Sequence, residues 1–152
     1  MSAATDLTVR KTISVACSVE HAFATFTEGI STWWPLGTHS IGDARAQEAV
    51  FERRAGGRIY EIWDDGREHD WGILLTWDPP HRLVYSWSPN PEQTMPTEVE
   101  VRFTSEAGGT RVELEHRGWE RLGENATDRQ QRYETGWDIV LAAYAEEAVC
   151  SV

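Results

Sequence analysis

Three titratable side chains lie on predicted apolar strand faces, where they could reach a bound ligand. Glu61 stands between Ile59 and Trp63 in a segment of period two, and His69 and His116 each occupy an apolar face of their own strands. A buried carboxylate can bind a polar group or act as a base, and two histidines in one pocket can exchange protons with a substrate. These residues predict a pocket with a few polar groups in an apolar lining.

Each of the three also has a structural interpretation. Tyr60 and Ile62 make the opposite face of this strand equally apolar, so the sequence does not decide which face is buried. Glu61 could therefore pair with Arg58 or Arg53 instead. A histidine on a core face is more often a hydrogen-bonded structural residue, and we favour that interpretation for His69 and His116. Both alternatives for Glu61 stay open at the level of sequence.

The other known kinds of chemical site find little support in the sequence. The spacing of the five histidines matches no metal site, and no Ser–His–Asp or Cys–His arrangement can be assembled. Gly56-Gly57 and Gly108-Gly109 precede strands rather than helices, so they are turns and not phosphate cradles. We therefore predict no metal, no cofactor and no catalytic residue, and we favour a protein without enzymatic activity.

Aromatic side chains are the strongest feature of the sequence. The chain has eight tryptophans in 152 residues, most of them in predicted strands or helices. Trp carries a large apolar area and an N–H that needs a partner when buried, so such an excess favours an aromatic-lined cavity. With the titratable residues above, the candidate lining residues are Trp33, Trp34, Glu61, Trp63, His69, Trp71, Ile73, Tyr85, Trp87, Phe103, His116, Tyr133, Trp137 and Leu141.

Composition limits the possible partners. The net charge is −11, which disfavours binding to nucleic acid or to an anionic membrane surface. No apolar run approaches the roughly 20 residues of a membrane span. No secretory signal precedes the first strand, so we expect a cytoplasmic protein. Cys17 and Cys150 form no CxxC motif and are expected to be reduced thiols, with a disulfide between them as the alternative.

Hydrophobic periodicity predicts one α+β domain over residues 8–148, with tails at 1–7 and 149–152. Ser18 is a good N-cap for an amphipathic helix that ends at Gly29, and Pro35 stops a second short helix. Thr127, with Gln130 in a capping-box pattern, opens a long last helix. Strands of period two are expected near residues 9–15, 49–53, 58–63, 69–77, 83–87, 99–103 and 112–116.

Several short strings, taken in order, resemble the START-like (SRPBCC) superfamily and its branch homologous to the activator of the heat-shock chaperone ATPase. They are Trp33-Trp34-Pro35, residues 56–62, Trp71-Gly72, residues 78–83 and Gly136-Trp137. The segments 29–35, 57–72 and 116–123 are also similar to enediyne (calicheamicin) self-resistance proteins. The resemblance implies a helix-grip, Bet v-like fold, in which a curved antiparallel sheet wraps around a long C-terminal helix and two short helices follow the first strand.

These observations lead to a ranked set of functions. The first is binding of a hydrophobic, aromatic small molecule between the sheet and the last helix. The alternatives are a resistance protein that sequesters a reactive natural product, an enzyme such as a cyclase or hydrolase, and a chaperone-ATPase co-factor. An exposed edge strand also allows a homodimer.

Overall fold

The computed structural model describes residues 7–36, 39, 42–88 and 96–148. The helices are α1 (Val19–Thr27), α2 (Ile30–Trp33) and α3 (Ala126–Glu147), with two 3₁₀ segments, η1 (Asp43–Arg45) and η2 (Trp119–Asn125). The strands are β1 (Val9–Val15), β2 (Ala46–Phe51), β3 (Arg58–Trp63), β4 (Glu68–Asp78), β5 (Arg82–Trp87), β6 (Thr97–Glu106) and β7 (Gly109–Arg117). No helix in these ranges is long and apolar enough to cross a membrane.

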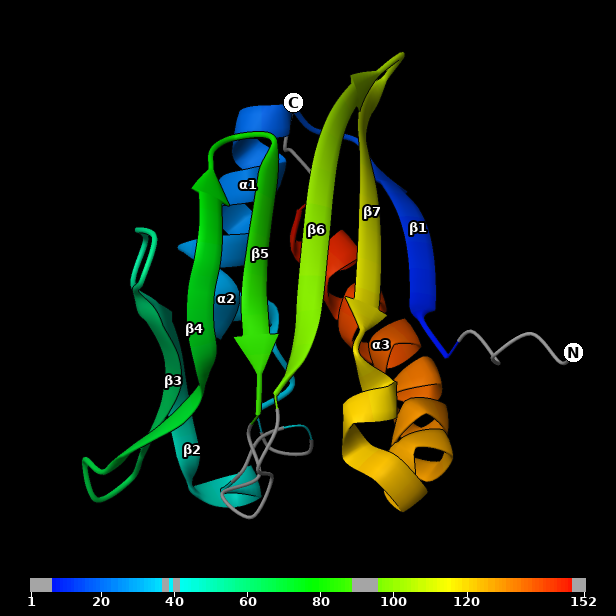
Figure 1. The fold of residues 1–152 in the computed structure, drawn as a ribbon. Coiled ribbons are helices and arrows are strands. Elements are labelled where there is room, and N and C mark those ends of the chain that lie inside the picture. Colours follow the sequence, from blue (N-terminus) through cyan, green and yellow to red (C-terminus); the bar gives the residue numbers. More distant parts are fainter. Residues whose placement is uncertain (1–6, 37–38, 40–41, 89–95, 149–152) are drawn as a thin grey trace, which may run out of the picture.

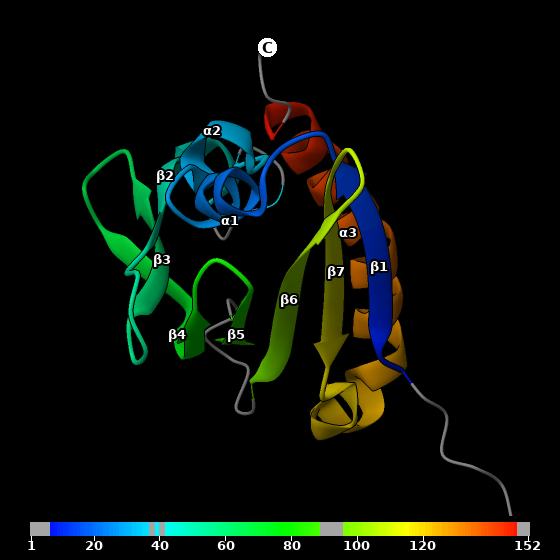
Figure 2. The same ribbon diagram turned by 90° about the horizontal axis from the view of Figure 1, so that it is seen from above.

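The strands form one antiparallel sheet in the order β1-β7-β6-β5-β4-β3-β2 (Figure 1). The sheet is strongly curved, and all three α-helices lie on its concave side (Figure 2). This arrangement confirms the predicted helix-grip fold. The alternating strands have one apolar face each, and burying those faces against the helices produces the core.

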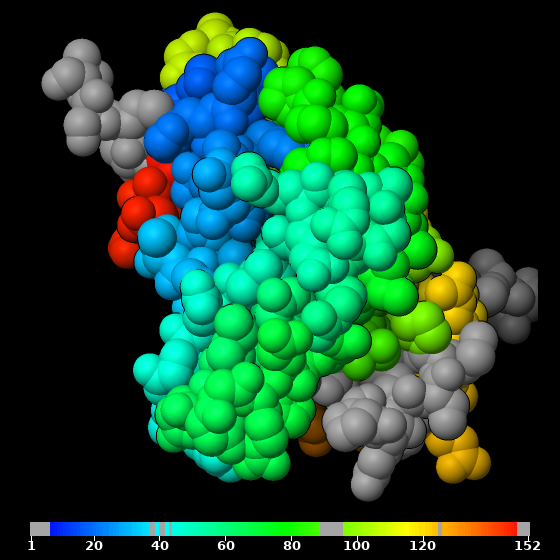
Figure 3. Space-filling model, turned by 90° about the vertical axis from the view of Figure 1, so that its left-hand side faces the viewer, coloured from blue at the N-terminus to red at the C-terminus, as the bar shows by residue number. Residues whose placement is uncertain are grey.

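The short helices close one end of the curved sheet. Ser18 caps α1 by accepting a hydrogen bond from the backbone N–H of His21 (3.2 Å), as predicted. In α2, the Ser31 hydroxyl accepts from the Ala49 N–H and donates to the Ala49 carbonyl, both at 2.8 Å. The helix therefore satisfies backbone groups of the edge strand β2 that no further strand pairs. Figure 3 shows α1 and α2 (blue) lying against β2 and β3 (teal) on this face.

Two predictions made from the sequence are wrong, the N-cap of the last helix and the state of Cys17. The 3₁₀ helix η2 precedes α3, which begins at Ala126, so Thr127 lies inside α3 and is not its N-cap. Cys17 is buried and disulfide-bonded rather than a reduced thiol. Cys150 lies outside the described residues.

Strand β4 departs from simple alternation. A strand of period two over 69–77 would place residues 69, 71, 73, 75 and 77 on one face, but Trp71 and Leu75 are each skipped in the pairing with a neighbouring strand. Such bulges reverse the face that the following residues occupy. Trp71 and Leu74 are consequently buried, whereas Ile73 and Leu75 are 47% and 50% exposed on the outer face.

Gly72 is required at the first of these bulges. A Cβ atom on Gly72 would overlap the backbone carbonyl of Ser86 on β5. The missing space for a Cβ shows that the two strands approach closely here, and the Ser86 hydroxyl also accepts from the Ile73 N–H at 3.0 Å. Glycine is the one residue that permits this approach.

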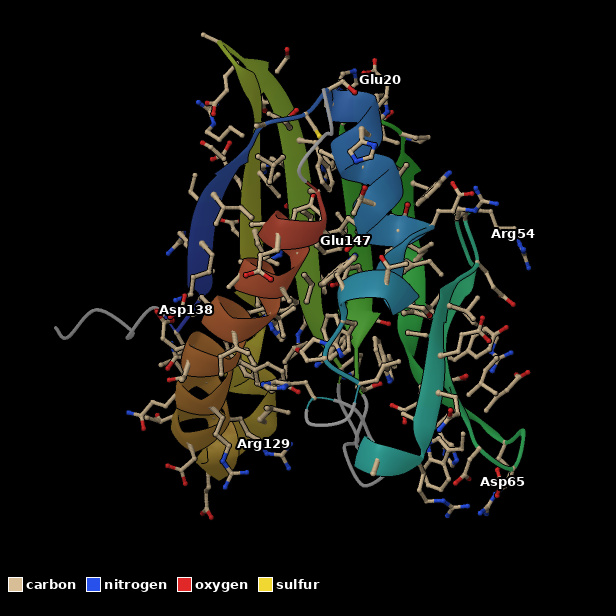
Figure 4. The ribbon with its side chains drawn as sticks, turned by 180° about the vertical axis from the view of Figure 1, so that it is seen from behind. Glu20, Arg54, Asp65, Arg129, Asp138 and Glu147 are labelled. Carbon is tan, nitrogen blue, oxygen red and sulfur yellow. The ribbon has the colours of Figure 1, made fainter. Side chains whose placement is uncertain are left out.

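Charged side chains cover the outside of the molecule. The six residues labelled in Figure 4 all point away from the interior; they are Glu20, Arg54, Asp65, Arg129, Asp138 and Glu147. Lys11 on β1 forms ion pairs with Glu134 and Asp138 on α3, both at 3.0 Å. These pairs hold the outer edge of α3 to the end of the sheet.

Candidate ligand-binding site

Four tryptophans meet in the interior on the concave side of the sheet, and we call them the tryptophan cluster. Trp34 follows α2, Trp71 lies on β4, Trp87 on β5 and Trp137 on α3. The ring of Trp34 lies 4.9 Å from that of Trp71 and 6.0 Å from those of Trp87 and Trp137, between centroids. The rings are tilted or edge-on to one another, which is the favourable geometry for aromatic pairs.

Large side chains join α3 to the centre of the sheet. The backbone of α3 runs close to β1, η2, α1 and α2. Its contacts with the strand residues Trp87 and His116 are instead made by Tyr133 and Trp137, through hydrogen bonds of 2.8 and 3.0 Å. Aromatic rings therefore occupy the space between helix and sheet where we predicted a ligand.

His116 is a fully buried member of this network and is neutral. Its Nδ1 accepts from the Trp137 indole N–H, so its proton resides on Nε2 and is donated to the Thr97 hydroxyl at 2.7 Å. Thr97 in turn donates to the Trp87 carbonyl at 3.2 Å. Burial lowers the pKa of His116 to about 3. With both nitrogens engaged, His116 has the structural role that we favoured and cannot act as a general base.

Tyr133 is the half-buried member of the network. Its hydroxyl oxygen accepts from the Trp87 indole N–H at 2.8 Å, and its ring packs against Trp119 and His116 with centroids 5.1 and 5.0 Å away. Burial raises the pKa of Tyr133, so the phenol stays protonated at neutral pH. The site thus contains a neutral O–H group next to the tryptophan cluster.

Glu61 is fully buried on the same concave side. It accepts hydrogen bonds from the Trp71 indole (2.6 Å), the Trp63 indole (2.8 Å) and the Gly42 backbone N–H (2.9 Å). The alternative of an arginine pair is wrong, because Arg58 binds Asp70 and Glu68 on the outer face and Arg53 pairs with Glu28. The buried interpretation holds, and the carboxylate fixes the orientation of two indole rings.

His69 is separated from His116 and has different surroundings. It stacks on the Trp63 ring at 3.9 Å, and its buried Nε2 has no hydrogen-bond partner in the described part of the chain. Trp63 is half-buried and has the Arg45 guanidinium over its ring at 4.5 Å. Strands β5 and β6 lie between β4, which carries His69, and β7, which carries His116, so the two histidines form no acid–base pair.

The remaining predicted lining residues are distributed over the interior. Trp33 contacts Tyr144 and Phe26 at the end closed by the short helices, where Phe103 also packs. Tyr85 lies between Phe51 and Trp87, and Leu141 is buried on α3. Ile73 lies outside the site because of the bulge in β4.

Sequence reasoning missed two parts of the network. Thr97 stands at the start of β6, two residues before the strand that we expected at 99–103, and Trp119 lies in the unexpected η2 helix. Trp119 donates to the His116 carbonyl at 2.9 Å and is 1% exposed. Its aromatic type was a usable signal, whereas nothing local marks Thr97.

A curved sheet gripping a long helix, with an aromatic interior that spans them, defines a protein of the helix-grip class. The family model described as Activator of Hsp90 ATPase homolog 1-like protein matches residues 16–146. The chain belongs to this family, which confirms the resemblance found in the sequence. No match was found among curated proteins.

Solved structures support the same placement. An anthrahydroquino-γ-pyrone synthase, Txn09, is 36% identical over 91% of this chain and 95% of its own, with a TM-score of 0.61. The self-sacrificing resistance protein CalC from Micromonospora echinospora is 28% identical over 94% of each chain, with a TM-score of 0.68. An Aha1 dimer from Colwellia psychrerythraea is 20% identical over 91% and 93%, with a TM-score of 0.67.

Proposed function

We propose that this protein binds a planar aromatic small molecule between α3 and the concave face of the sheet. The observation that carries the proposal is the set of aromatic rings that joins α3 to β5 and β7, with Tyr133 as its half-buried member. Hydrogen bonds fix the indoles of Trp71, Trp87 and Trp137, so the rings are preorganised and lose little freedom on binding. Trp87 and Trp137 are 5% and 2% exposed, so the ligand would enter beside Tyr133, where the set is only half-buried.

The comparisons favour an aromatic ligand. Two similar proteins are a synthase of an anthrahydroquino-γ-pyrone and a self-sacrificing resistance protein. The first of these acts on an aromatic ring system, and the proposal extends that class of ligand to this chain. Apolar burial would supply the affinity, at roughly 25 cal/mol per Å² of apolar surface.

The binding proposal is tested with a matched pair of tryptophan variants. Native mass spectrometry and titration calorimetry would measure binding of a panel of polycyclic aromatic compounds. We expect saturable one-to-one binding, weakened about tenfold by Trp87→Phe, which removes the indole that reaches Tyr133. Trp77→Phe is the control, because Trp77 packs against Phe23 on α1 and has no ring contact with the cluster among the described residues. Absence of binding to the unmodified protein, or equal weakening by both variants, would refute the proposal.

A second candidate is an enzyme that closes a ring in an aromatic polyketide, and the 36% identity to Txn09 favours it. His116 supplies no base, so such an enzyme would act by binding and orienting its substrate beside the neutral Tyr133 hydroxyl. Incubation with aromatic polyketide precursors, followed by chromatography, would reveal a cyclised product. Recovery of unchanged precursor after binding has been demonstrated would limit the protein to a binding role.

We also propose that two copies of the chain can associate. The fold neighbour from Colwellia psychrerythraea is described as a dimer, and β1 ends the sheet of this chain. Light scattering coupled to gel filtration would give twice the 17.2 kDa mass of one chain for a dimer. A single-chain mass across micromolar concentrations would refute it.

A further inference from the structure

The hydrogen-bonded network that ends at Tyr133 uses each of its donors except one. The Trp137 N–H reaches His116, the His116 N–H reaches Thr97, and the Thr97 hydroxyl reaches the Trp87 carbonyl. The Trp87 indole N–H reaches the oxygen of Tyr133. The series ends there, because the Tyr133 O–H donates to no residue in the described part of the chain.

The Tyr133 hydroxyl is therefore a donor that is held in place and unused by the protein. Its oxygen already accepts the Trp87 N–H, and such a bond polarises the O–H group and strengthens it as a donor. Packing of the ring against Trp119 and His116 fixes where the group sits. The Tyr133 residue as a whole is half-buried, so a ligand can reach part of this side chain, and the raised pKa keeps the phenol protonated.

We propose that Tyr133 selects ligands that carry a carbonyl oxygen on the aromatic ring system, as in a quinone or an aryl ketone. This inference rests on the proposed binding function and specifies the ligand class. A planar ring bound beside Tyr133 would present an in-plane carbonyl oxygen at its rim, where the hydroxyl can donate to it. A hydrocarbon of the same outline makes the aromatic contacts alone. When it binds, the Tyr133 O–H loses access to water and gains no acceptor in exchange.

The test compares anthraquinone-2-sulfonate with anthracene-2-sulfonate, which share their outline and charge and differ in the two ring carbonyls. Calorimetry at physiological ionic strength would measure both affinities for the unmodified protein and for Tyr133→Phe. We expect the unmodified protein to prefer the quinone by about fivefold to tenfold, the value of one neutral hydrogen bond. Tyr133→Phe should abolish the preference, so that the ratio of the two affinities falls to about one even where both affinities change.

Two outcomes overturn the inference without touching the binding proposal. They are equal affinity of the unmodified protein for both compounds, and a preference for the quinone that survives in Tyr133→Phe. Failure of the unmodified protein to bind either compound would overturn the binding proposal as well.

A second measurement avoids dependence on the variant's folding. The infrared carbonyl stretch of anthraquinone-2-sulfonate should move to lower wavenumber when it binds the unmodified protein, because hydrogen bonding weakens the C=O bond. An unshifted stretch in the complex would also overturn the inference.

Discussion

Glu100 on β6 is the centre of a charge network on the outer face of the sheet, and replacing it with glutamine should destabilise the protein. Its carboxylate accepts from Arg82 (2.6 Å), Arg102 (2.8 Å) and Arg117 (2.7 Å), which come from three adjacent strands. Burial by itself would raise the pKa of Glu100, but the hydrogen bonds from Arg117, Arg82 and Arg102 outweigh it and lower the pKa to about 2. The carboxylate side chain is 4% exposed, so water screens it weakly.

The size of the effect follows from this lowered pKa. A drop in the pKa of Glu100 from its ordinary value of 4.5 to about 2 corresponds to about 3 kcal/mol of stability at neutral pH. The arginine side chains are 32% to 56% exposed, which reduces the value. We therefore expect Glu100→Gln to lower the free energy of unfolding by about 2 kcal/mol at pH 7.

The pH dependence has a definite sign. Because the folded-state pKa lies below the unfolded value, the stabilisation is complete above pH 4.5 and is lost as the pH falls toward 2. Urea denaturation of both proteins at pH 7 and pH 3 would measure this. The difference between Glu100→Gln and the unmodified protein should shrink to less than about half at pH 3, because the variant lacks the titrating carboxyl.

Glu113→Gln is the matched control. Glu113 lies on the neighbouring strand β7 and binds Arg111 at 3.2 Å, but both side chains are more than 40% exposed. We expect a change of less than about 0.5 kcal/mol for this exposed pair. Equal effects of the two variants, or a Glu100→Gln effect that is the same at pH 7 and pH 3, would refute the reasoning.

Two further predictions concern the buried histidine and the glycine at the bulge. Burial lowers the pKa of His116 to about 3, so NMR should show its imidazole neutral down to about pH 4. The free energy of unfolding should fall as the pH drops below 6.5, because the unfolded chain binds a proton before the folded protein does. An imidazole that titrates near pH 6 in the folded protein would contradict this. Gly72→Ala should destabilise the fold by more than about 2 kcal/mol, since its Cβ would overlap the backbone of β5. A Cβ atom on Gly136 in α3 would have no neighbour within 4 Å, so Gly136→Ala should stabilise the protein by up to about 1 kcal/mol in thermal unfolding. Similar effects of the two alanine substitutions would contradict the bulge argument.

Local patterns in the sequence determined the secondary structure and the fold class. Period-two alternation predicted the antiparallel strands. Apolar residues at helical spacing, among them Tyr133, Trp137 and Leu141, predicted the last helix. These patterns suffice because an apolar face must be buried, and the order of the elements leaves few ways to bury it. The resemblance in short strings then specified the helix-grip arrangement, which the structure confirms.

Contacts between distant segments were decided by the tertiary structure alone. Alternation placed Ile73 inside, but bulges against β3 and β5 turn it outward, and a bulge depends on the pairing with neighbouring strands. Glu100 reads as a solvent-facing residue, yet arginines from β5, β6 and β7 cover it. Glu61 had two equal interpretations in the sequence, and the indoles of Trp63 and Trp71 settle its role. Sequence periodicity reports which face a side chain occupies, whereas the partner that it meets there depends on strand register and helix placement, which are set over the whole chain.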